Sequence, residues 1–130
     1  MSAVGTARKT LAHVSVCVGC CCGQTEKGHP PVPVTWLKEQ WKARRLNKHV
    51  QLTISGCLGP CDLSNVVSIG SVLGTTWIGG LETQHEYDQL LDWASRTAQQ
   101  QRVLPLPAAL TACVFDRFRD AAVTVTSARP

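Results

Sequence analysis

Six of the seven cysteines in this chain of 130 residues fall into two clusters whose chemistry suits metal binding. The clusters read Cys17-x-x-Cys20-Cys21-Cys22 and Cys57-x-x-x-Cys61. Each directly follows a stretch that alternates like a strand, and each contains or adjoins glycines, so both are expected to lie in loops at strand ends. Neighbouring strands can bring two such loops to one end of a sheet, where four thiolates would converge.

Four chemistries are open to these thiols. A [2Fe–2S] cluster needs four thiolates, two for each iron. A structural zinc ion would use a C-x-x-C pair and a second pair, namely Cys17, Cys20, Cys57 and Cys61. A thioredoxin-type dithiol enzyme would use Cys17 and Cys20, and all six could instead be inert buried thiols. Ligand softness separates iron from zinc poorly, so the residue types favour the cluster without excluding zinc.

The sequence predicts a mixed sheet with two main helices, in the α/β or α+β class. Alternating residues indicate strands over 13–17, 50–55, 65–69 and 75–78, the last two forming a hairpin with glycines at 70 and 74. An apolar stripe predicts one helix from Val34-Thr35 to Asn47-Lys48, with Thr35 as its N-cap, and a second over 83–102. The expected order is therefore β-α-β-β-β-α, or β-α-β-β-α if one strand is absent.

A single domain over residues 10–102 is expected, followed by a C-terminal extension over 103–130. Pro105 and Pro107 end the second helix. Residues 108–118 are predicted to form a short helix with Leu110, Val114 and Phe118 on one side, and the last ten residues to be frayed.

The charge pattern and the termini limit the partners and the compartment. The net charge of +4 does not indicate a nucleic-acid binder. A basic run over 38–48 and an acidic run over 82–92 are solvated helix faces or a docking surface for a redox partner. No signal-like or membrane-spanning apolar run is seen, so a cytoplasmic location with reduced thiols is expected.

The spacing of the cysteines resembles that of the thioredoxin-like [2Fe–2S] ferredoxin family, which includes relatives of the 24-kDa-type subunit of respiratory complex I. Cys17-x4-Cys22 and Cys57-x3-Cys61 are separated by residues 23–56, and the segment Gly56–Asp62 reads GCLGPCD. The resemblance covers roughly residues 14–94. It implies a thioredoxin-like fold, one-electron chemistry rather than enzymatic catalysis, and one [2Fe–2S] cluster held by Cys17, Cys22, Cys57 and Cys61.

The Cys20-Cys21 doublet departs from the family pattern. Cys22 fits the second ligand position best by spacing, and Cys20 is the reserve ligand. The two extra thiols are expected to be spare, to take part in ligand exchange, or to bind a second metal. Cys113 is expected to act as a small hydrophobic residue in the extension. His29 and His49 are not needed as ligands, because enough thiols are present.

The segments VCVGCCCG, PPVPVTWLKEQWK and LTISGCLGPCD also resemble a subgroup of ferredoxins linked to aerobic cobalt insertion into the corrin ring. The partners this implies are redox proteins, among them a cobalt chelatase, and a second copy of the chain is a further candidate. Under the alternatives, the chain would handle zinc or cobalt as an accessory protein or would act as a dithiol oxidoreductase.

Overall fold

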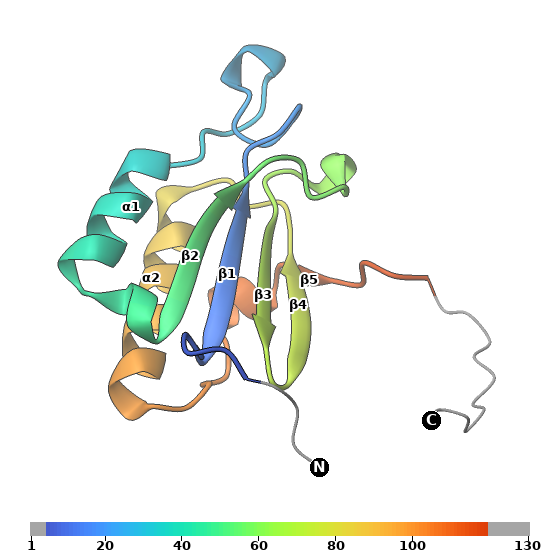
Figure 1. The fold of residues 1–130 in the computed structure, drawn as a ribbon. Helices are drawn as coiled ribbons and strands as arrows, with labels where there is room; N and C mark the ends of the chain where they lie inside the picture. Colours follow the sequence, from blue (N-terminus) through green and yellow to red (C-terminus); the bar gives the residue numbers. More distant parts are fainter. Residues whose placement is uncertain (1–4, 120–130) are drawn as a thin grey trace.

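The computed structural model describes residues 5–119, which form a five-stranded mixed sheet in the order β2-β1-β3-β4-β5. The strands are β1 (Ala12–Cys17), β2 (Val50–Ser55), β3 (Val67–Ser71), β4 (Gly74–Ile78) and β5 (Val114–Phe115). β1 and β2 are parallel, and every other neighbouring pair is antiparallel. The parallel pair requires a crossover, which the first helix supplies (Figure 1).

The helices are α1 (Val34–Ala43), α2 (Gln84–Gln100) and the one-turn α3 (Ala108–Thr111). Short 3₁₀ turns lie at η1 (Thr25–Lys27), η2 (Leu46–Lys48) and η3 (Cys61–Leu63). α1 and α2 contact each other on one side of the sheet (Figure 1). α2 begins with a capping box, in which Thr83 and Glu86 satisfy each other's backbone N–H groups.

The core fills the space between that face of the sheet and the two helices. β1 contributes every second residue, Ala12, Val14 and Val16, as the pleat of a half-buried strand requires. Two buried tryptophans also fix the chain by hydrogen bonds. The indole N–H of Trp41 donates to the Val50 carbonyl at 2.8 Å, and that of Trp93 donates to the Leu104 carbonyl at 2.8 Å.

The predicted class and element order are confirmed, with three corrections. The sheet has a fifth strand. Thr35 is not the N-cap of α1, because the helix begins at Val34 after Pro33 and has no side-chain cap. A capping box needs a carboxylate or amide side chain three residues after the N-cap. Thr83 has Glu86 at that position, but Thr35 has Lys38, so Thr35 cannot form a capping box.

The third correction concerns the extension. The predicted helix over 108–118 ends at Thr111, and Val114 and Phe115 pair instead with Ile78 and Trp77 of β4. β-branched and aromatic side chains favour strands, and β4 offers a free edge for pairing. This pairing outweighs the helical spacing of the apolar residues, which had predicted a helix. Leu104 and Leu110 lie in the core, while the division at residue 102 stays a prediction. The end predicted to be frayed falls outside the described residues.

Within residues 5–119, no helix is both long enough and apolar enough to cross a bilayer.

Candidate metal centre

The two cysteine loops leave the sheet at the same end. Cys17 is the last residue of β1, and Cys57 follows β2 after a single glycine. Because the two strands are parallel neighbours with Cys17 opposite Ser55, their loops begin side by side (Figure 1). The Val18 N–H donates to the Ser55 carbonyl at 3.0 Å and holds the first loop to the second strand.

Three thiols form an exposed group at this end. The sulfur atoms of Cys20, Cys57 and Cys61 all lie within 4.8 Å of one another. The Sγ atom of Cys61 is 3.4 Å from that of Cys57 and 3.5 Å from that of Cys20. Tetrahedral coordination with metal–sulfur bonds of about 2.3 Å places sulfur atoms about 3.7 Å apart. The separations are therefore close to those that one metal ion requires.

Two further thiols lie on the inner side of the same hollow. Cys17 and Cys22 are buried and form a small apolar cluster with Val66. Burial, followed by a hydrogen bond with the Cys17 thiol, raises the pKa of Cys22 to about 12. Cys17 and Cys22 are therefore two buried thiols of one small cluster, on the inner side of the hollow that Cys57 and Cys61 also line.

One hollow therefore contains all six clustered cysteines. Its wall consists of Cys17, Cys20, Cys21, Cys22, Cys57, Gly59, Pro60, Cys61 and Val66. Carboxylates and imidazoles are absent from this wall. A wall of thiols alone suits soft metals and iron–sulfur clusters.

The thiols of the exposed group compete for protons. Hydrogen bonds to Cys57 and then to Cys20 raise the pKa of Cys61 to about 12. Hydrogen bonds with the thiols of Cys61 and then Cys21 lower the pKa of Cys20. Adjacent thiolates repel each other, so only some of them ionise without a cation. A bound cation would remove this competition and release the protons.

Gly19 allows the two loops to touch. A Cβ atom at position 19 would lie 2.7 Å from the Cα atom of Cys57, a distance that real Cβ atoms do not tolerate. Gly59, in the second loop, has a φ of +118°, which other residues rarely adopt. A Cβ atom at Gly56 would have no neighbour within 4 Å, so the close contact between the loops is made at Gly19.

Asn65 holds the first cysteine loop and was not predicted as a functional residue. Its side chain is buried. Its Oδ1 atom accepts from the Gly23 N–H at 2.8 Å, and its Nδ2 atom donates to the Pro30 carbonyl at 2.9 Å. One feature of the sequence could have identified Asn65. It stands at the start of a predicted strand, although asparagine is depleted in strands.

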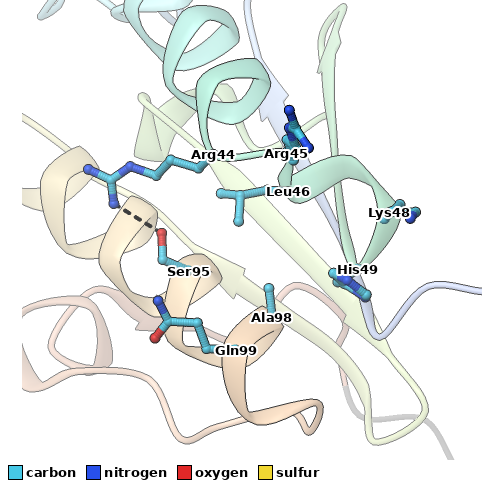
Figure 2. A pocket seen from close by; sticks show the side chains of 8 residues that line it. All are labelled: Arg44, Arg45, Leu46, Lys48, His49, Ser95, Ala98 and Gln99. Carbon is cyan, nitrogen blue, oxygen red and sulfur yellow. Dashed lines mark hydrogen bonds between the residues drawn. The ribbon is translucent and has the colours of Figure 1, made fainter.

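The remaining candidates lie elsewhere. The Cys113 thiol packs beside the main core and contacts the Ala109 carbonyl at 3.5 Å. His49 lines a different hollow between η2 and α2, at the opposite end of β2 from Cys57 (Figure 2). Within residues 5–119, the grouped metal-ligating side chains are cysteines, and no histidine joins them.

That second hollow is basic and has no thiol. Its lining consists of Arg44, Arg45, Leu46, Lys48, His49, Ser95, Ala98 and Gln99. Arg44 donates a hydrogen bond to the Ser95 hydroxyl at 3.0 Å, as Figure 2 shows. The lining therefore suits contact with acidic groups and cannot hold the metal considered above.

No family model and no curated protein matches the chain. Among solved structures, the chain is similar to the wild-type thioredoxin-like [2Fe-2S] ferredoxin from Aquifex aeolicus. The two sequences are 18% identical, the match covers 84% of this chain and 100% of that chain, and the TM-score is 0.47. At that identity, the roles of the cysteines have to be assessed from this chain's own geometry.

Proposed function

We propose that this chain holds one [2Fe–2S] cluster and carries single electrons between protein partners. The observation that carries the proposal is one hollow lined by two buried thiols and by a pair of thiols nearer the surface. Cys17 and Cys22 form the buried pair and Cys57 and Cys61 the outer pair, whose sulfurs are 3.4 Å apart. A cluster with two thiolates on each iron needs two such pairs facing each other.

The donor set and its surroundings fit this group. In this proposal Cys17 and Cys22 would hold one iron, and Cys57 and Cys61 the other. When bound, the group supplies reversible one-electron chemistry. Val66 is buried beside the inner pair, and Leu58, Trp77 and Phe115 pack against it, so this side of the hollow excludes water. The outer pair lies nearer solvent, where a partner protein could receive the electron.

A mononuclear zinc site is the second candidate. It is favoured by the group of Cys20, Cys57 and Cys61, whose sulfurs already lie within 4.8 Å of one another. Cys21, with its sulfur 3.6 Å from that of Cys20, or Cys17 would complete a set of four. A dithiol enzyme that uses Cys17 and Cys20 is less well supported, because Cys17 is buried and a reactive thiol needs access.

Anaerobic purification followed by metal, acid-labile sulfide and visible absorption analysis tests the proposal. We expect brown protein with about two irons and about two sulfides per chain, bleached by dithionite. Cys22→Ser should abolish the colour, whereas Cys113→Ser is the matched control and should keep it. Colourless protein with one zinc, lost in Cys20→Ser and retained in Cys22→Ser, would establish the second candidate instead.

The partners in this proposal are redox proteins that meet the cysteine end of the sheet. The basic hollow of Figure 2 lies at the start of β2. At about 3.3 Å per residue, the two ends of this strand lie about 17 Å apart. Supply of electrons to cobalt insertion into a corrin, a cytoplasmic location and pairing of two copies belong to the proposal on sequence grounds only. Nucleic acid and membranes are not proposed as partners.

A further inference from the structure

We infer that Arg117 is a positioning residue of the metal centre, a fixed positive charge that favours the reduced state. The inference rests on the proposed function, because it concerns the electron that the cysteine loops would receive. Arg117 belongs to the C-terminal extension, for which no role was predicted.

Arg117 lies against the second cysteine loop. β5 pairs Phe115 with Trp77, and Arg117 follows two residues later. A Cβ atom at Gly59 would be 2.5 Å from the Nη2 atom of Arg117. The guanidinium therefore occupies the space in which a side chain at position 59 would stand, midway between Cys57 and Cys61 in the sequence.

Aromatic rings hold the guanidinium in this place. Its Cζ atom lies 5.5 Å from the centre of the Trp77 ring and 5.7 Å from that of Phe118. Both distances are within the range of cation–π attraction. Trp77 and Phe115 also pack against the buried cluster of Cys17, Cys22 and Val66. The same aromatic wall therefore supports the arginine on one side and the cysteine hollow on the other.

The charge of Arg117 is not neutralised by a neighbour within residues 5–119. Its Nε atom is buried without a hydrogen-bond partner, and the ion pair in the described chain is Arg96–Asp92. Asp62, next to Cys61, is exposed, so water screens its carboxylate. Asp116, next to Arg117, is exposed as well. Lys27, whose ammonium donates to the Cys20 carbonyl at 2.8 Å, is an exposed positive charge at the first loop. The guanidinium of Arg117 is partly buried against the second loop, so water screens it less than these exposed groups.

An electron arriving at the cysteine loops adds one negative charge, and no bond is made or broken. The electron comes from a reduced protein partner, which is oxidised in the same step. A fixed positive charge beside Gly59 stabilises the added charge and so raises the reduction potential. Net charge close to an iron–sulfur centre is one of the properties that set its potential.

The test compares the midpoint potentials of the loaded wild-type protein and three variants by anaerobic titration followed by visible absorption. At the wild-type midpoint, Arg117→Gln should raise the ratio of oxidised to reduced protein about tenfold, which is 59 mV for one electron. Arg117→Lys, which keeps the charge, should restore most of the potential. Arg96→Gln removes a distant exposed charge and should leave the midpoint unchanged. An unchanged potential in Arg117→Gln overturns the inference.

A second readout needs no bound metal. In the reduced, metal-free protein, Arg117→Gln should shift the indole N–H resonance of Trp77 and leave those of Trp41 and Trp93 in place. If the Trp77 resonance does not move, Arg117 does not lie on this ring and the inference fails. Loss of the cluster in both Arg117→Gln and Arg117→Lys also overturns it, because packing rather than charge would then matter. Wild-type protein without acid-labile sulfide refutes the proposed function instead.

Discussion

Asn65→Ala should destabilise the metal-free protein by about 2–3 kcal/mol. The substitution removes the hydrogen bonds from Gly23 at 2.8 Å and to Pro30 at 2.9 Å. Each bond contributes about 1 kcal/mol net, and a donor or acceptor left buried without a partner adds to the loss. Gly23 and Pro30 are only half-buried, so water can partly replace the lost Asn65 side chain as their hydrogen-bond partner. The expected loss in the free energy of unfolding therefore stays close to the sum for the two hydrogen bonds.

Urea unfolding of the reduced, metal-free chain measures this loss, with circular dichroism as the signal. Asn47→Ala is the matched control, since the exposed Asn47 side chain accepts one backbone bond, from the Leu52 N–H at 2.9 Å. That variant should lose about 0.5–1 kcal/mol. Equal losses in the two variants would refute the reasoning, because a buried two-bond clamp would then count no more than an exposed single bond.

Three further predictions concern single side chains. Gly19→Ala should lower the free energy of unfolding by about 1–3 kcal/mol and should lower the iron content. The reason is that the new Cβ atom would lie 2.7 Å from the Cys57 Cα atom. A full iron content in this variant would contradict the contact between the two loops. Tyr87→Phe should leave the urea midpoint unchanged or raise it, because within residues 5–119 the buried Tyr87 hydroxyl has no hydrogen-bond partner. A loss of more than about 1 kcal/mol in the free energy of unfolding would contradict this and would reveal a hydrogen bond. Burial alone would raise the pKa of the Glu86 carboxyl, but hydrogen bonds from the N–H groups of Thr83 and Glu82 outweigh it and lower the pKa. The resulting stability is present above the ordinary glutamate pKa of about 4.3 and is lost as the pH falls through the folded value. Urea midpoints should therefore fall more between about pH 6 and about pH 3 in wild type than in Glu86→Gln, and parallel curves would exclude the capping role.

The parts of the fold that could be predicted are those governed by local periodicity. Strand β2 matches the predicted range, and β1 and β4 differ from it by one residue, because alternation along each strand records which face is buried. α2 shows both an apolar stripe and the Thr83–Glu86 start signal. The prediction for the end of α1 was wrong: it placed the end at Asn47-Lys48, but the helix ends at Ala43. Arg45 takes a left-handed backbone conformation, and the separate turn η2 follows it.

The site was predictable as two loops, but its membership was not. Strand-end positions for Cys17 and Cys57 follow from the pattern, and the parallel pairing then brings the loops together. The sequence spacing says nothing about side-chain direction, so it could not show that Cys20 faces Cys61 while Cys17 and Cys22 are buried together. Which four thiols act as ligands stays a prediction.

Contacts between segments far apart in the chain account for the rest. Asn65 reaches Gly23 and Pro30, and Arg117 reaches Gly59, over separations that periodicity cannot detect. β5 is two residues long and forms only because β4 offers a free edge. Such pairings depend on the assembled sheet rather than on local sequence.

The short strand β5 also protects the molecule from self-association. Without it, the backbone N–H and C=O groups along Trp77 and Ile78 would be open to another chain, and the Trp77 ring would lose its contact with Phe115. A truncation before residue 114 should therefore make the protein prone to aggregation and should also alter the metal centre. A shortened version of this chain should retain β5, or should carry a charged residue on β4 that opposes aggregation.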